Sequence, residues 1–206
     1  MLVFLNSEDK VDYDKIDENT TVKDLLAAVD VFLSENPLPC DNCEESCCKK
    51  AWSVEMDNVC VNRLSGGSPE AQRAFVKEHL VKKKNYYRDM DQYVLNKEKN
   101  CTYITDSNKC IIYQDRPIIC RLYLCSAKSL RYGTLRELVG TTYLKALVLE
   151  YRMSSKILSE KTISKYKRNP VLLSREYDVT LHKIIKYGGQ EGWIDRDESG
   201  MLLTQG

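Results

Sequence analysis

Residues 40–48 read CDNCEESCC, so four of nine consecutive positions are cysteine. The C-x2-C pair at its start can turn both sulfurs towards one ion, and such pairs are common half-sites for tetrahedral zinc or an Fe–S cluster. Neighbouring side chains usually diverge, so Cys47 and Cys48 are expected to serve two sites, or to divide into one ligand and one packing residue. The run predicts a metal-dependent centre for the fold.

A second cysteine-rich stretch reads CTYITDSNKCIIYQDRPIICRLYLC at residues 101–125. Its four cysteines are separated by eight, nine and four residues, a spacing that alone specifies a metal site only weakly. The two stretches together supply eight thiols, and soft thiolates select zinc or Fe–S iron over hard cations. The ninth cysteine, Cys60, lies between them, and a buried packing thiol is the alternative to a metal ligand at this position.

The chain has 206 residues, nine cysteines and two histidines, with a net charge of +1. An odd number of cysteines cannot close into a disulfide framework within one chain. No apolar run approaches the roughly 18 residues needed to span a membrane, and the amino-terminal residues do not resemble a signal peptide. We therefore expect a cytoplasmic location, where clustered cysteines more often bind metal or catalyse than form disulfides.

Hydrophobic periodicity predicts a mainly helical chain with short strands in its middle. A capping box at Thr134 and Glu137 predicts the start of the longest helix, and Gly188-Gly189 predicts the end of the last one. The tail after Gln190 is polar and is expected to be loosely held. The predicted helices are 20–36, about 68–83, about 134–160 and about 175–187, and the predicted strands are 52–56, 92–95, 102–105 and 111–113.

These elements predict an α+β, mainly helical fold around a cysteine-rich metal-binding centre with short antiparallel strands. The expected organisation is an acidic helical extension at 1–39, the metal-binding region at 40–125 and a basic helical region at 126–206, packed as one globular unit. Residues 1–39 carry a net charge of −6 and residues 126–190 a net charge of +8. The basic helices are either a solvated face or a docking surface for an acidic protein partner. Stacking aromatics and finger-type Cys/His spacing are missing, so the pattern indicates neither nucleic acid nor membrane binding.

The two cysteine stretches together resemble the CxxCxxCC family, described as zinc- or iron-chelating domains, which includes small bacterial proteins and the flagellin lysine N-methylases. The most specific part is the CIIYQDRPIICR motif at residues 110–121. Three residues precede the paired cysteines here, where the family name implies two. The resemblance implies seven metal-ligand candidates and accommodates an eighth, Cys125; the seven are Cys40, Cys43, Cys47, Cys48, Cys101, Cys110 and Cys120.

Physical roles follow for the residues around Cys120. Arg116 and Arg121 bracket it, and nearby cations would stabilise an anionic thiolate centre, although ordinary surface ion pairs are the alternative. Pro117 would fix the backbone ahead of the ligand turn. Tyr113, together with Tyr123, could shield the site from water.

Three functions are compatible with these features. The first is an Fe–S cluster protein, for instance with a [4Fe–4S] cluster, in a redox or protein-modification role. The second is a structural zinc module that mediates a protein interaction. The third, implied by the resemblance, is an S-adenosylmethionine-dependent lysine N-methylase, although the sequence contains no recognisable motif for that methyl donor. Spread ligand spacings favour the cluster, because structural zinc sites tend to use compact pairs.

Overall fold

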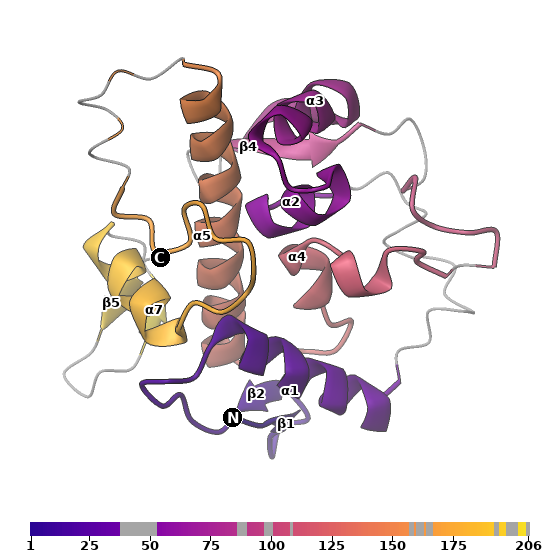
Figure 1. Cartoon of the computed structure of the whole chain (residues 1–206). Helices are drawn as coiled ribbons and strands as arrows, with labels where there is room; N and C mark the ends of the chain where they lie inside the picture. Colours follow the sequence, from indigo (N-terminus) through magenta and orange to yellow (C-terminus); the bar gives the residue numbers. More distant parts are fainter. Residues whose placement is uncertain are drawn as a thin grey trace.

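The computed structural model describes residues 1–37, 53–85, 90–96, 101–107, 109–156, 159, 163, 167–191, 194–196 and 202–204. The chain is a mixed α/β structure in which helices predominate and the strands form antiparallel pairs, as the sequence predicts in outline (Figure 1). In chain order the elements are β1 (Val3–Leu5), β2 (Val11–Tyr13), α1 (Val22–Glu35), α2 (Asn58–Ser65), α3 (Pro69–His79), β3 (Leu80–Asn85), β4 (Met90–Leu95), the 3-10 turn η2 (Tyr113–Asp115), α4 (Ile118–Arg121), α5 (Leu130–Ser154), α7 (Leu181–Gln190), β5 (Ile194–Arg196) and β6 (Leu202–Thr204).

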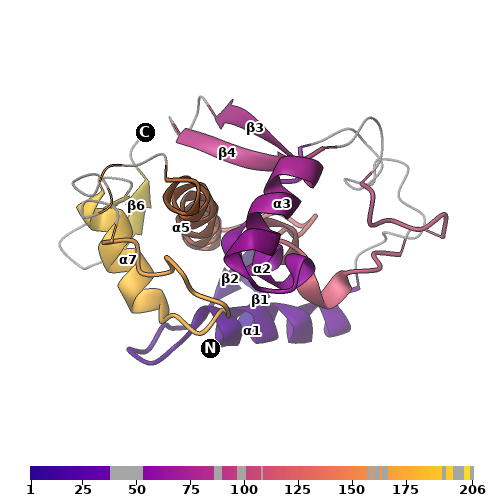
Figure 2. The same cartoon turned by 45° about the horizontal axis from the view of Figure 1, so that its top comes forward.

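The long helix α5 forms the axis of the molecule. Helix α7 packs on one side of it, α2, α3 and the β3–β4 ribbon pack on the other, and α1 crosses near its amino-terminal end (Figures 1 and 2). Fifteen of its 25 residues are buried, which is what a helix covered on several sides requires. The predicted inward stripe is confirmed, because all six of its members are buried: Leu135, Leu138, Val139, Thr142, Ala146 and Leu149.

Helix α5 joins two buried apolar clusters. Residues from its amino-terminal half, such as Leu135 and Val139, pack with β2, α1, α4 and α7. Leu147 and Val148, about two turns beyond Val139, pack with α2, α3, β3 and β4. The second cysteine stretch touches both clusters, since Ile118 belongs to the first and Tyr103 packs against the second.

The predicted helix at 20–36 is confirmed as α1. Its amino-terminal cap is Thr21, which accepts a hydrogen bond from the Asp24 backbone N–H while the Asp24 carboxylate accepts one from Thr21 N–H. This reciprocal pair satisfies two of the donors that a helix start leaves open. The apolar positions predicted to face inward are buried from Val22 to Phe32, so α1 contributes to the first cluster.

The predicted strand at 52–56 is supported over its described part. Met56 N–H donates to Tyr93 O at 2.9 Å, and Leu95 N–H donates to Val54 O at 2.9 Å, so this segment pairs with β4. The predicted strand at 92–95 is confirmed as part of β4. Helix α2, which the sequence analysis missed, begins two residues after Met56.

The predicted helix at 68–83 is correct at its start and wrong at its end. Ser68 caps α3 as predicted, but the helix ends at His79 and residues 80–85 form β3. The six residues of β3 pair in register with the six of β4, from Leu80 opposite Leu95 to Asn85 opposite Met90. Pairing with the next strand along the chain therefore overrides the helix signal within residues 80–83.

The strands predicted at 102–105 and 111–113 are reduced to a single bridge. Ile104 pairs with Cys110, while residues 111–115 turn into η2 instead of continuing as a strand. Residues 101–111 thus form a tight loop that is closed by a few backbone hydrogen bonds.

The amino-terminal cap of helix α5 lies five residues before the predicted cap, Thr134. Ser129 is the actual cap, accepting from Tyr132 N–H at 3.0 Å, and Thr134 is buried inside the helix. Both residue types are good caps, so local sequence did not distinguish Ser129 from Thr134.

The last predicted helix, at 175–187, is displaced towards the carboxyl terminus and becomes α7. Residues 177–180 instead run beside the start of α1 without forming a helix. Lys23 N–H donates to Tyr177 O, Val22 N–H donates to Val179 O, and Leu181 N–H, at the first residue of α7, donates to Thr20 O. These tertiary hydrogen bonds replace the helical ones that were predicted.

The glycine pair predicted to end this helix lies inside it. Gly188 packs against α5 so closely that a Cβ atom would lie 2.2 Å from Leu138 Cδ1, whereas a Cβ atom at Gly189 would meet nothing within 4 Å. The absence of a side chain at Gly188 therefore allows α7 to dock on α5.

Gly188→Ala is expected to destabilise the protein by about 1–3 kcal/mol, because the added methyl group overpacks the α5–α7 contact. Gly189→Ala is the matched control; in a helix it should leave stability unchanged or raise it by up to about 1 kcal/mol. Urea unfolding of both variants measures the difference. Equal effects would contradict the close packing of Gly188.

The tail, which was expected to be loosely held, contains two paired strands, with Ile194 opposite Thr204 and Arg196 opposite Leu202. Both strands belong to the carboxyl-terminal part of the molecule beside α5 and α7. Among the described helices, none combines the length and the apolar character that crossing a membrane would need.

Candidate metal centre

The first cysteine stretch, with candidate ligands Cys40, Cys43, Cys47 and Cys48, lies outside the described residues. The second stretch is described except for residue 108, and its four candidate cysteines can be placed. Cys101 and Cys110 are half-buried, Cys120 is half-buried in α4, and Cys125 is exposed in the following loop.

A compact loop brings Cys101 and Cys110 near each other. Thr105 N–H donates to Lys109 O, and Ile111 N–H donates to Tyr103 O, each at 2.9 Å, so the chain reverses between the two cysteines. Burial raises the pKa of the Cys110 thiol, and the neighbouring Cys101 adds to this rise. Cys101 and Cys110, with eight residues between them, therefore lie close enough for one thiol to affect the pKa of the other.

Cys120 is positioned by a short helix whose start is held by a buried carboxylate. Pro117 occupies the cap position of α4, and Cys120 N–H donates to Pro117 O at 2.9 Å. The amide that directly follows Pro117, Ile118 N–H, donates to Asp57 Oδ2 at 2.7 Å. Pro117 thus directly precedes the turn that carries Cys120, and Asp57 is a partner of this turn that the sequence analysis missed.

Asp57 connects three separate parts of the chain. It caps α2 by accepting from Cys60 N–H at 2.9 Å, it accepts from Ile118 N–H of α4, and it accepts from the Tyr177 hydroxyl at 3.2 Å. Its side chain is fully buried, and burial raises its pKa while the three donors oppose that rise. The available sequence signal was an aspartate directly before a helical segment, a common cap arrangement.

A second link between α2 and the cysteine motif is Arg63. Its guanidinium pairs with Asp115 of η2 at 3.3 Å and with Glu176, and it lies over the Tyr177 ring at 5.4 Å. This network holds the segment between Cys110 and Cys120 against α2. The sequence analysis missed Arg63, and no local pattern identified it.

The two arginines near Cys120 have different surroundings. Arg116 stacks on the exposed Tyr113 ring at 3.7 Å and lies close enough to Cys110 to oppose the rise in its thiol pKa. Arg121 forms an ion pair with Asp30 of α1 at 3.0 Å. Arg116 is therefore placed to influence a candidate ligand, whereas Arg121 anchors α4 to α1, as the ion-pair alternative anticipated.

Cys125 has a cationic environment. Lys128 lies near Cys125 and also over the Tyr123 ring, with 5.4 Å between its ammonium nitrogen and the ring centre. The Arg136 guanidinium lies 6.0 Å from the centre of the same ring. Tyr123 is 38% exposed and Tyr113 45% exposed, so both rings contact cations at the surface.

Cys60 is fully buried within the second apolar cluster, the surroundings expected of a packing thiol. Burial raises its thiol pKa strongly, and the charges of Asp57 and Cys120 add to the rise. Cys60 and Cys120 are therefore neighbours, although they are 60 residues apart and lie on different helices.

Among the described residues, no three His, Cys, Asp or Glu side chains lie close enough together to hold a metal ion. The donors that the described part offers are thiols, and their chemistry fits zinc or iron. The geometry thus supplies pairs of neighbouring thiols and cations beside two of the candidates.

Comparison with known proteins gives one match. No curated protein and no solved structure matches the chain. The family model that matches covers residues 39–139 and is described as a putative zinc- or iron-chelating domain, which supports metal binding in general terms. The resemblance inferred from the two cysteine stretches is thereby confirmed, since residues 39–139 match the model of the CxxCxxCC family.

Proposed function

We propose that this protein holds an Fe–S cluster through cysteine thiolates and serves a redox or protein-modification role. The observation that supports this most is the origin of the described candidates in separate elements: the 101–111 loop, helix α4 and the loop that follows it. Ligands gathered from several elements suit a multi-iron cluster better than the compact paired motifs of structural zinc sites.

Thiols from residues 40–48 would supply the remaining ligands of this metal site. The described residues bring together pairs of thiols and no group of three metal-binding side chains, so further ligands have to come from elsewhere in the chain. The cluster would supply electron-transfer chemistry when bound. The chain's own contribution is to orient Cys120 through Asp57 and to place Arg116 beside Cys110.

A structural zinc module is the second candidate, and the Cys101–Cys110 loop favours it. Two adjacent thiols on a tight loop form the kind of half-site that zinc uses, with the C-x2-C pair at residues 40 and 43 as the other half. In that case the protein would present its helices to a partner, with the basic region 126–190 as the docking surface.

Metal analysis after anaerobic purification distinguishes these functions. Iron, zinc and acid-labile sulfide are measured on one sample together with an absorption spectrum. About four irons and four sulfides per chain, with broad absorption near 400 nm, are expected for the cluster. One or two zinc ions without sulfide would contradict the cluster and support the structural module. A chain without either metal would contradict both.

A further inference from the structure

A surface groove of about 840 Å³ lies between residues 1–4, at the start of β1, and helix α1; we call it the β1–α1 groove. None of the described candidate cysteines lines it, so it is distinct from the proposed metal centre. One face of α1 forms a whole wall, because its lining residues lie three, four, seven and eleven positions after the first. They are Asp24, Ala27, Ala28, Val31 and Glu35.

Strand β1 forms the outer edge of its sheet, in which β2 is its neighbour. Asp14 N–H donates to Leu2 O at 3.1 Å, so Leu2 and every second residue after it turn their backbone groups towards β2. The N–H and C=O groups of Val3 and Leu5 therefore point away from β2. In the part of the chain that the structure describes, no backbone hydrogen bond from another segment reaches these groups.

The groove runs along this outer edge. Successive side chains of a strand point to opposite faces, and Val3 is buried whereas Leu2 is 64% and Phe4 40% exposed. All three line the groove, which places it at the edge of the strand, since a hollow over one face would be lined by every second residue. Val31 on the opposite wall is 55% exposed, so both walls offer apolar contacts.

Three exposed carboxylates, Asp17, Asp24 and Glu35, line the groove, and its lining includes no lysine, arginine or histidine side chain. Between described residues, their one ion pair joins Asp17 to Lys15 at 3.8 Å, and both side chains are so exposed that water screens the attraction. Asp24 accepts hydrogen bonds from the backbone N–H and the hydroxyl of Thr21, which lower the pKa of its carboxyl. Because Thr21 is uncharged, these bonds hold the carboxylate in place without neutralising it.

Carboxylates also outnumber the described cations around the groove. Residues 1–39 contain nine Asp or Glu and three Lys. Arg121 of α4 and Arg131 of α5 each form an ion pair with an aspartate of this segment, and the Met1 ammonium group adds one more positive charge. These six cations leave an excess of negative charge on this side of the molecule.

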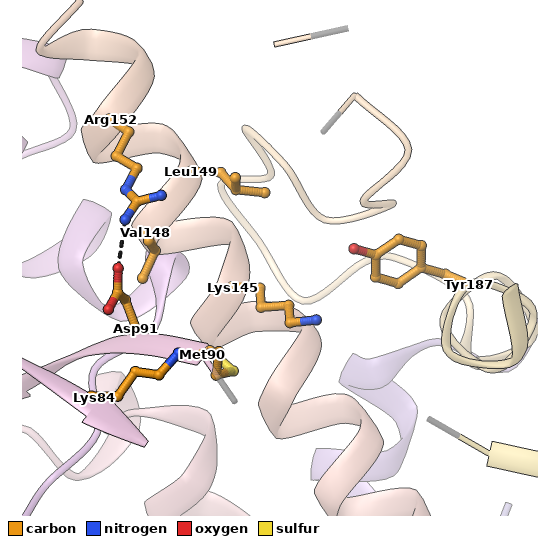
Figure 3. A pocket seen from close by; sticks show the side chains of 8 residues that line it. All are labelled: Lys84, Met90, Asp91, Lys145, Val148, Leu149, Arg152 and Tyr187. Carbon is orange, nitrogen blue, oxygen red and sulfur yellow. Dashed lines mark hydrogen bonds and ion pairs between the residues drawn. The ribbon is translucent and has the colours of Figure 1, made fainter. Parts of the chain in front are cut away.

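A smaller cavity, of about 240 Å³, lies where β3, β4, α5 and α7 meet, and its charges are arranged differently. The Asp91 carboxylate in its lining pairs with Lys82 at 2.9 Å and with Arg152 (Figure 3). Opposite charges of the chain itself thus meet in that cavity. In the lining of the β1–α1 groove, by contrast, all the charged side chains are carboxylates.

We propose that the β1–α1 groove binds an extended, basic segment of a partner protein, which adds to β1 as a further strand. The outer N–H and C=O groups of Val3 and Leu5 would pair with the backbone of the segment, as exposed edge strands do with peptides. Alternate apolar side chains of the segment would contact Leu2 and Val31, and its lysines or arginines would lie near the three carboxylates. A symmetric pair with a second copy would bring two acidic grooves together, so charge favours a basic partner.

Fluorescence anisotropy of the full-length protein at low salt tests this proposal with a labelled nine-residue peptide that alternates lysine and valine. The peptide should bind saturably and more weakly as salt is added, and a peptide that alternates glutamate and valine should not bind. N-methylation of either the valines or the lysines removes the N–H groups along one edge of the peptide. One of the two methylated peptides should therefore bind at least tenfold more weakly.

Val31→Lys should weaken binding of the lysine–valine peptide at least tenfold, because it replaces an apolar contact with a like charge. Val81→Lys is the matched control, since Val81 is an exposed valine of β3 outside the groove lining, and it should leave affinity unchanged. Glu35→Lys provides a second test if Val31→Lys does not fold.

Three results would overturn the proposal. The first is that the lysine–valine peptide does not bind, or binds Val31→Lys and Val81→Lys equally well. The second is that both methylated peptides bind as tightly as the parent peptide, which would exclude addition of a strand. The third is a dimer of the wild-type protein in sedimentation that Val31→Lys converts to a monomer, because the groove would then be an interface between two copies.

Discussion

Asp57→Ala is expected to lower the free energy of unfolding by about 3–5 kcal/mol. The substitution removes the cap of α2, and it leaves Ile118 N–H and the Tyr177 hydroxyl without the acceptor they use in the folded protein. Buried donors that lose their acceptor cost more than an exposed hydrogen bond. Because typical domains are stable by about 5–15 kcal/mol, the loss would be a large part of the total. Chemical denaturation followed by circular dichroism measures it.

Ser68→Ala is the matched control, because Ser68 caps α3 through one exposed hydrogen bond to Ala71 N–H. It should cost only about 1 kcal/mol. Asp57→Asn should fall between the two, since an amide offers one acceptor oxygen where Cys60 N–H and Ile118 N–H each use one carboxylate oxygen. If Asp57→Ala cost no more than Ser68→Ala, the link between α2 and α4 would not contribute to stability.

Cys43→Ser is expected to reduce bound metal to less than half of the wild-type content and to destabilise the central region. Metal binding contributes free energy to folding, so loss of a ligand lowers stability as well as occupancy. A loss of about 3 kcal/mol would lower the thermal midpoint by about 6–12 °C for a chain of this size. Metal analysis and thermal unfolding of the same anaerobic sample measure the two effects together.

Cys60→Ala is the control that separates metal binding from packing. Cys60 is fully buried, so its removal should lower stability through the small cavity it leaves, yet it should keep the metal content unchanged. Retention of full metal content and stability by Cys43→Ser would remove Cys43 from the ligand set. Loss of metal from Cys60→Ala would instead make this neighbour of Cys120 a ligand.

Elements with strong local signals were predictable from the sequence. Helix α1 has an apolar face at helical spacing and a proline beyond its end, and it appears where predicted. The start of α3 follows from Ser68-Pro69, a cap followed by a residue suited to the first helical turn. The inward stripe of α5 also follows from periodicity, because burial of one helix face requires apolar residues at those positions.

The errors have tertiary causes. Residues 80–85 leave the helix because β4 offers them a paired strand. Residues 177–180 stay outside a helix because this segment and Leu181 form hydrogen bonds with residues 20–23 at the start of α1. Gly188-Gly189 lies inside α7, although glycine usually marks a helix end, because close packing on Leu138 needs a residue without a side chain. The partners of residues 177–181 and of Gly188 are distant in sequence, so no short stretch of sequence reveals them. Strand β4 is close in sequence to β3, but it lies outside the residues whose pattern predicted the helix.

For the candidate site, too, some features follow from the sequence and others only from the tertiary structure. Cysteine content and spacing in the linear chain were sufficient to identify the chelating family, because thiolate chemistry depends on residue type and the match to residues 39–139 depends on the motif. Folding was needed to bring Cys60 beside Cys120 and to join α2, α4 and Tyr177 through Asp57. Ligand chemistry is carried by single side chains and short spacings, whereas buried hydrogen bonds and cavities exist only after distant segments have packed together.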